Sequence, residues 1–267
     1  MLRARVLTAL ALGAVILLAL FAAPPVVTAI VMSLIVLAGA WEWSAFLKGA
    51  SLPARVAFLL LVLAVALWVQ LQIRDPAQFV NLLYVALGGW CLALLWILVA
   101  PGSTPRWAAL LMGLVALVPT LLTLVRMDAH WSRGAEWTLY VLLLAFAADT
   151  GAFFAGRSFG RHKLAPRVSP GKTWEGVIGG VLGVAVVAMA GAWWFGLPSG
   201  PLLLLSLVAG LFSVVGDLTE SLLKRGAGLK DSGALFPGHG GVLDRIDSVT
   251  AAAPVLALGL IRLGVGS

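Results

Sequence analysis

The chain consists largely of apolar runs that are long enough to cross a lipid bilayer. A transmembrane helix needs about 20 mostly apolar residues, and short stretches of proline, glycine and charge divide this sequence into about nine such runs. No run alternates polar and apolar residues as the strands of a membrane barrel do. The sequence therefore predicts an all-α polytopic membrane protein, with transmembrane helices at roughly 6–23, 26–47, 56–73, 79–99, 107–125, 137–156, 176–196, 201–223 and 248–265.

Charged residues are too scarce for an ordinary soluble domain. They make up 11% of the 267 residues, against about 25% in soluble proteins. Lysine and arginine outnumber aspartate and glutamate by 18 to 11, so the net charge is +7. In a membrane protein such an excess reports topology and contact with anionic lipids, so we expect membrane lipids and no nucleic acid as partners. The single cysteine, Cys91, lies in an apolar run and excludes a disulfide framework.

The basic residues also predict the orientation of the chain. If the N-terminus is cytoplasmic, all but four of the 18 lysines and arginines fall on the cytoplasmic side, as the positive-inside rule requires. The first run resembles a signal peptide, because Arg3 and Arg5 precede it and small residues follow it. Its apolar stretch is long for a signal peptide, so we expect a retained helix and an N-in, C-out topology. The four exceptions are Arg74, Arg126, Arg133 and Arg262.

Two long polar segments, 157–175 and 224–247, fall on the same predicted cytoplasmic side, and most of the acidic residues lie in or beside them. Asp149 and Asp217 lie inside apolar runs, where a carboxylate is costly and usually faces a cavity or a partner. Asp217 shares one helix face with Glu220, Ser221 and Lys224. This face forms either ion pairs within the helix or a hydrated site for a cation, and its depth in the membrane favours the second interpretation.

The segment 224–247 combines glycines with alternating acids and bases, which suits a site for phosphate and metal. We expect Asp244 to be a metal ligand. Asp247 is either a ligand or the N-cap of the ninth helix, a task that Ser248 could share. His239 is a candidate general acid, phosphate donor or turn residue.

The segment 157–175 contains Gly171-Lys172-Thr173, but Pro166 stands where a P-loop needs its first glycine. Ser169 and Pro170 instead predict a helix start, with serine as N-cap and proline as first residue. Lys172 and Thr173 would then lie at the positive end of the seventh helix, where an anion could bind. The alternative is a basic loop that contacts anionic lipid, formed by Arg157, Arg161, Lys163 and Arg167.

These residues resemble the phosphatidate cytidylyltransferase (CDP-diacylglycerol synthase) family. Its pattern, Ser-x-apolar-Lys-Arg, Lys-Asp, Pro-x-His-Gly-Gly and Asp-Arg-x-Asp, is present in order between Ser221 and Asp247. The blocks that begin at Asp149 and Ser169 are also similar to the family, although Phe153 stands where many members carry tyrosine. The specific match covers residues 137–250.

The resemblance implies an enzyme of the bacterial inner membrane that joins CTP to phosphatidic acid at a cytoplasmic site. The products are CDP-diacylglycerol and pyrophosphate, and Mg²⁺ is the implied cofactor, with K⁺ in some members. Residues 1–136 would form a scaffold and lipid cradle, and residues 137–267 the catalytic region. A homodimer is one possible assembly.

We assign the candidate site residues accordingly. Asp217 and Asp244 are the leading metal ligands, and a second ion or outer support would involve Asp149, Asp231 and Asp247. His239 would orient a phosphate or donate to the leaving pyrophosphate. The expected phosphate-binding residues are Lys172, Ser221, Lys224, Arg225, Lys230, Gly240, Gly241 and Arg245.

The chemistry of the implied reaction fits these residues. A phosphate monoester carries a charge of about −1.5 to −2 near neutral pH, so the nucleophile is already ionised. The difficulty is to bring two polyanions together, which cations and positioning relieve. Two alternatives remain, namely a nucleotidyltransferase for another isoprenoid lipid phosphate and an ion or metabolite transporter. The transporter predicts inverted repeats or broken helices, and neither is visible in the sequence.

Overall fold

The computed structural model describes residues 2–233 and 240–266, with side chains described from residue 10 onward. This part of the chain is almost entirely helical, as predicted, with one short hairpin. The elements are α1 (Leu2–Ala22), α2 (Pro25–Trp43), the 3-10 turn η1 (Ser44–Phe46), α3 (Leu52–Gln72), α4 (Pro76–Val99), α5 (Arg106–His130), α6 (Gly134–Phe159), β1 (Lys163–Ala165), β2 (Ser169–Thr173), α7 (Trp174–Phe195), α8 (Ser199–Gly226) and α9 (Leu243–Arg262).

Among the described residues, seven helices, α2 to α8, are long and apolar enough to cross a membrane. Much of their apolar surface points outward. In α3 only 17% of the most apolar window is buried, and Trp68 and Leu71 are exposed by 62% and 73%. Such surfaces are unfavourable in water but suit lipid. The protein therefore has the pattern of an all-α polytopic membrane protein, and the two further crossings by α1 and α9 stay a prediction.

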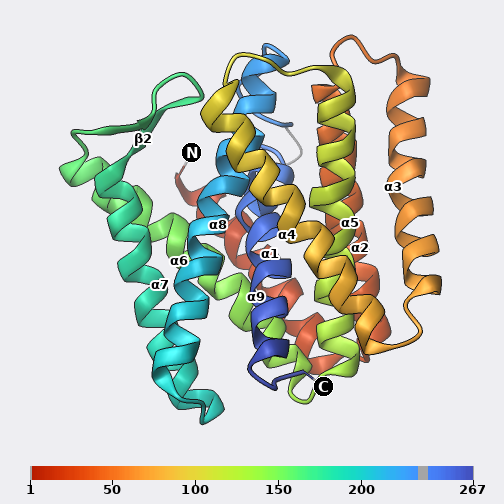
Figure 1. Ribbon diagram of the computed structural model, residues 1–267, viewed down its shortest axis with the longest axis vertical. Coiled ribbons are helices and arrows are strands. Elements are labelled where there is room, and N and C mark those ends of the chain that lie inside the picture. The colour runs from red at the N-terminus through yellow and green to blue at the C-terminus, as the bar shows by residue number, and fades with distance from the viewer. Residues whose placement is uncertain (1, 234–239, 267) are drawn as a thin grey trace.

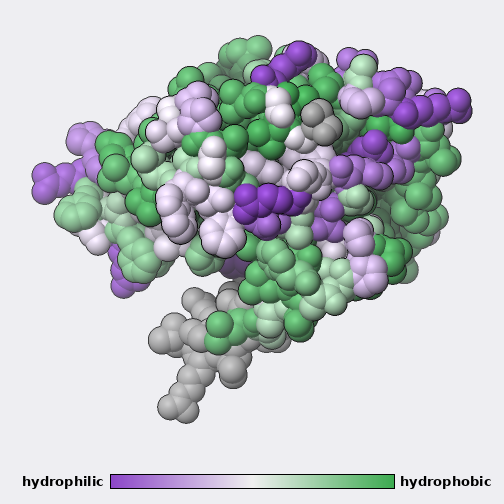
Figure 2. Space-filling model, turned by 90° about the horizontal axis from the view of Figure 1, so that it is seen from below, coloured by the Kyte–Doolittle hydropathy of each residue, from purple (hydrophilic) through white to green (hydrophobic). Residues whose placement is uncertain are grey.

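The helices form one bundle, with α3 at one edge and α7 at the other (Figure 1). The hairpin and the connection between α4 and α5 lie toward one end of this bundle, and the C-terminus lies at the opposite end. Figure 2 looks at that opposite end, where hydrophilic residues lie between hydrophobic ones.

Helix α9 forms the centre of the packing. It contacts α8, α5, α4, α6 and α2, and Ala251, Ala252 and Ala253 are almost completely buried. Because other helices surround α9, its polar side chains face protein rather than lipid. These contacts also cross the predicted boundary at residue 136, and the division into two regions stays a prediction.

Helices α6 and α7 pack closely because small residues face one another. A Cβ atom on Gly180 would lie 2.9 Å from the carbonyl oxygen of Ala148, so the two backbones approach to a distance that only glycine allows. Gly156 and Gly176 also face one another, nearer the hairpin, where a Cβ atom on Gly156 would lie 3.5 Å from Cα of Gly176. This packing fixes Asp149, on α6, beside the start of α7.

The predicted helix start at Ser169 is wrong. Residues Ser169–Thr173 form β2, which pairs antiparallel with β1, and α7 begins only at Trp174. The N-cap is Thr173, whose Oγ1 accepts a hydrogen bond from the N–H of Gly176 at 3.1 Å. Proline has a backbone dihedral that suits an edge strand as well as a first helical turn, so the local pattern was ambiguous. Lys172 therefore lies on a strand, two residues before the helix.

Of the two roles considered for Asp247, the N-cap of the ninth helix is wrong, and the role of metal ligand stays a prediction. Helix α9 begins at Leu243, and Asp247 lies in its second turn, only 7% exposed. The connection between α8 and α9 is correspondingly shorter than the polar segment 224–247, because both helices extend into it.

Candidate active site

A cavity of about 540 Å³ lies between α6, α7, α8, α9 and β2. Part of its wall is apolar and includes Val177, Val181, Leu211 and Val214. The charged part of the wall comes from the ends of the same helices and from the hairpin. It comprises Asp149, Arg157, Lys172, Lys224, Asp217, Asp244, Arg245 and Asp247.

Lys172 connects the hairpin to α8. Its Nζ lies 2.5 Å from Oδ2 of Asp217, and both side chains are less than a third exposed. Ser221, one turn further along α8, donates a long hydrogen bond of 3.5 Å to Oδ1 of Asp217. The i, i+4 spacing that the sequence showed thus produces a direct contact.

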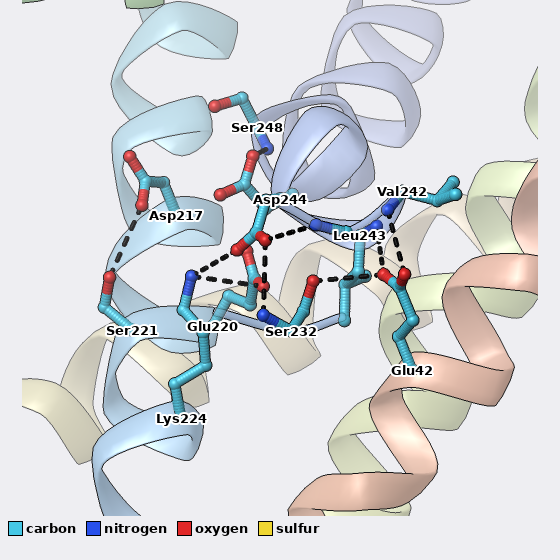
Figure 3. A network of polar contacts seen from close by, with 12 residues as sticks. Glu42, Asp217, Glu220, Ser221, Lys224, Ser232, Val242, Leu243, Asp244 and Ser248 are labelled. Carbon is cyan, nitrogen blue, oxygen red and sulfur yellow. Dashed lines mark hydrogen bonds and ion pairs between the residues drawn. The ribbon is translucent and has the colours of Figure 1, made fainter. Parts of the chain in front are cut away.

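Lys224 connects α8 to α9, as Figure 3 shows. Its Nζ lies 2.6 Å from Oδ1 of Asp244 and 3.3 Å from Oε1 of Glu220. The other oxygen of Asp244 accepts hydrogen bonds from the backbone N–H groups of Gly241 and Ser232, at 2.8 and 3.2 Å. Asp244 is therefore held by three donors from two parts of the chain.

Three more carboxyl groups lie beside these pairs: Glu220 and Asp247 are buried, whereas Asp149 is exposed at the cavity wall. Asp149 accepts a hydrogen bond of 2.9 Å from the hydroxyl of Ser248 and thereby links α6 to α9. Glu220 is 1% exposed, and its oxygens receive no hydrogen bond of good geometry from the described residues. Asp247 interacts electrostatically with Asp149, Asp217 and Glu220. The site thus concentrates negative charge next to two lysines.

Comparison with known proteins identifies the family of this chain. The model of the Cytidylyltransferase family matches residues 3–261. The chain belongs to this family. It is 42% identical to the phosphatidate cytidylyltransferase of Pseudomonas aeruginosa over the full length of both chains. It is 39% identical to that of Haemophilus influenzae over 95% of this chain and 96% of the relative. A Staphylococcus aureus phosphatidate cytidylyltransferase is 44% identical over 49% of this chain and 51% of its own length.

The carboxylates that line the cavity suit a hard cation whose other ligands come from the substrate. Mg²⁺ prefers oxygen ligands and usually combines one or two carboxylates with phosphate oxygens and water. Within residues 2–233 and 240–266, no three acidic, histidine or cysteine side chains converge as a complete metal cage. The oxygens of Glu220 are buried and receive no hydrogen bond of good geometry from the described residues. Together with the neighbouring carboxylates, they suit an Mg²⁺ ion that takes its remaining ligands from phosphate and water.

The other predicted site residues lie at different distances from the cavity. Arg245 lines it and interacts electrostatically with Asp149. Arg225, Lys230 and Asp231 are exposed and are not part of the cavity wall, so their roles stay predictions. His239 lies outside the described residues.

Gly240 and Gly241 shape the surroundings of Asp244. Gly240 has a φ of +80°, and a Cβ atom there would lie 2.8 Å from Oδ2 of Asp244. This position therefore requires glycine for both its backbone conformation and its space. Gly241 contributes its N–H to Asp244, as described above.

Two glutamates that organise the site had no role in the sequence analysis. Glu175 accepts hydrogen bonds from the backbone N–H groups of Arg161 and His162, at 3.1 and 3.2 Å, and its Oε1 lies 2.6 Å from Nδ1 of His162. It thereby fixes the hairpin that carries Lys172. Glu42, on α2, is 5% exposed and contacts the start of α9. Its only signal in the sequence was that a lone carboxylate stood at the end of an apolar run.

Proposed function

We propose that the protein transfers the cytidylyl group of CTP to phosphatidate. A phosphate oxygen of phosphatidate attacks the α-phosphorus of CTP, and the bond from that phosphorus to the oxygen bridging to the β-phosphate breaks. The products are CDP-diacylglycerol and pyrophosphate. Family membership and the printed names of relatives that are 39% and 42% identical over nearly the whole chain support this proposal.

The observation that carries the proposal is the mixed wall of the cavity. Its apolar part fits the acyl chains of a lipid, and its charged part fits phosphates. The lining cations Arg157, Lys172, Lys224 and Arg245 would lower the repulsion between two polyanions. Phosphatidate is already ionised near neutral pH, so no strong general base is required.

The residues have distinct proposed roles. Asp217 and Asp244 would hold Mg²⁺, with Asp149 and Asp247 in support, and when bound the ion neutralises charge on phosphate oxygens. Lys172 and Lys224 now pair with those two carboxylates, and we propose that they exchange these partners for phosphate oxygens when substrates bind. A K⁺ ion is a candidate for a second position in the same acidic cluster.

We further propose that all nine helices cross the membrane, with the N-terminus and the site on the cytoplasmic side. The hairpin, which carries several basic residues, lies at the end of the bundle opposite the C-terminus (Figure 1). An odd number of crossings would place the two termini on opposite sides. With bacterial relatives, the expected location is a bacterial inner membrane.

The test is pyrophosphate release by the purified protein in detergent, supplied with CTP, phosphatidate and Mg²⁺. We expect CTP-dependent release together with a cytidylylated lipid, and loss of at least tenfold in activity for Asp217→Asn and Asp244→Asn, which remove a proposed charge on the metal side. Glu136→Gln, which removes a carboxylate at the other end of α6, is the control and keeps its activity. No release with CTP and phosphatidate, or faster release with an isoprenoid phosphate as the lipid, would refute the assignment.

A further inference from the structure

Glu42 contacts the backbone beside the active site from a part of the sequence that is distant from every other site residue. It lies near the end of α2, yet its carboxylate accepts hydrogen bonds from the backbone N–H groups of Val242 and Leu243, at 3.1 and 2.8 Å. A third hydrogen bond of 3.0 Å comes from the hydroxyl of Ser232. Figure 3 shows Glu42 on α2 facing these donors, on the side of the α9 N-terminus away from Asp217.

Glu42 supplies the hydrogen-bond acceptor that the start of α9 lacks among its neighbours in the sequence. The first N–H groups of a helix have no partner within the helix, and a side chain before it normally accepts from them. Here the N-cap residue is Val242, whose side chain makes no such hydrogen bond. Glu42 provides the acceptor instead, and its negative charge is favourable at the positive end of the helix dipole.

The same stretch of backbone also binds Asp244, a proposed metal ligand. Ser232 gives its hydroxyl to Glu42 and its backbone N–H to Asp244. Gly241 donates to Asp244, while the next two N–H groups along the chain donate to Glu42. The backbone on both flanks of the connection from α8 to α9 is therefore held between two carboxylates, one from each half of the protein.

Space around Glu42 is as restricted as its hydrogen bonding. A Cβ atom on Gly233 or on Gly241 would collide with its carboxylate. The glycines thus allow the backbone to lie directly against the carboxylate of Glu42. The whole Glu42 residue is only 5% exposed. A buried carboxylate is favourable only when donors surround it, so loss of Glu42 would leave those N–H groups without an acceptor.

We propose that Glu42 is a positioning residue for the reaction, and this inference rests on the proposed function. By fixing Ser232 and the Gly241–Leu243 backbone, it sets the orientation of Asp244 toward Lys224 and the cavity. It does not contact the substrates itself. The N-terminal helices then contribute to catalysis through this one carboxylate as well as through their apolar surface.

The test compares Glu42→Gln with Glu136→Gln, which removes a carboxylate that binds Arg133 and Trp194 away from the site. Glutamine keeps the size of Glu42 but turns an NH₂ group toward N–H donors. We expect the KM for CTP and the Kd from direct CTP titration to rise about tenfold in Glu42→Gln, the factor that one lost hydrogen bond to a charged group gives. Both constants stay at wild-type values in Glu136→Gln, even where the two variants lose similar thermal stability.

Two further measurements trace the effect to the contact between Glu42 and Ser232. Trypsin should cleave faster after the exposed Lys230 in Glu42→Gln, because the contact between Glu42 and the hydroxyl of Ser232 is weakened and the hydrogen bond to Asp244 alone remains intact there. Ser232→Ala removes one of the three hydrogen bonds and should raise the KM for CTP about threefold, with little added effect in the double variant. This milder variant also provides the test if Glu42→Gln does not fold.

The outcomes distinguish the two proposals. An inactive wild-type protein would refute the function and not the contacts of Glu42. If the wild type is active and the Glu42→Gln and Ser232→Ala proteins lose turnover only in proportion to their folded fraction, with the KM and Kd for CTP unchanged, the positioning role is wrong.

Discussion

Replacing Lys224 with methionine should destabilise the protein strongly, because one ammonium group serves two buried carboxylates. Nζ lies 2.6 Å from Asp244 and 3.3 Å from Glu220, and these side chains are 14% and 1% exposed. Removing one partner of a buried ion pair costs about 3 to 5 kcal/mol, since an uncompensated charge is left behind. Coulomb energy falls with distance, so the attractions of Nζ to the two carboxylates differ by a factor of only about 1.3. Without Lys224, Asp244 keeps two backbone N–H donors and Glu220 keeps none among the described residues, so the larger part of the cost falls on Glu220.

A second substitution tests this reasoning. In Lys224→Met with Asp244→Asn, one of the two stranded charges is gone, so part of the roughly 3 to 5 kcal/mol, and less than half of it, should return. The assay is the free energy of unfolding in a denaturing detergent titration, with Lys230→Met as the matched control for an exposed lysine. The control should stay within about 0.5 kcal/mol of wild type. A double variant that is less stable than Lys224→Met would refute the assigned charge balance.

Three further predictions concern the surroundings of the site. Gly240→Ala should lower turnover, because its Cβ would displace Asp244. Gly228→Ala is the control, because Gly228 has a similar φ of +75° and open space around it. It should cost only the backbone strain of about 1 to 2 kcal/mol and leave turnover unchanged. Glu175→Gln should speed tryptic cleavage within the hairpin, which mass spectrometry would detect. The reason is that the hydrogen bonds from the backbone N–H groups of Arg161 and His162 to residue 175 are weakened. Chelation with EDTA should abolish pyrophosphate release and added Mg²⁺ should restore it; release that persists in EDTA would contradict the metal assignment.

The part of the site that could be predicted is the part set by helical spacing. Asp217, Ser221 and Lys224 lie on one face because they are separated by four and three residues, and the structure joins each of them to a partner at the cavity. The apolar runs likewise predicted the helices, since burial in lipid needs length and composition rather than particular contacts. Both features can be read from one continuous stretch of sequence.

The features that were missed depend on distant partners. Residues Ser169–Thr173 form a strand only because β1 is available to pair with them, and Asp247 enters a helix interior because Glu42 supplies the N-terminal acceptor. Glu42 and Leu243 are 201 positions apart. No local pattern could connect them, and the capping rules looked for an acceptor next to the helix.

The geometry of α8 constrains how the proposed lipid substrate lies in the cavity. Val214 and Asp217 both line the wall and are three residues apart, which corresponds to about 4.5 Å along the helix axis. The transition from apolar to charged wall therefore takes less than one helical turn. A lipid whose acyl chains lie against Val177 and Val214 must then place its phosphate at the level of Asp217 and Lys172, because a phosphate any deeper would lose its cations and acyl chains any higher would meet charge. Under the proposed function, the boundary between the two kinds of wall would set the depth of the nucleophile, and the carboxylates and lysines at that boundary would be the groups that reach the triphosphate.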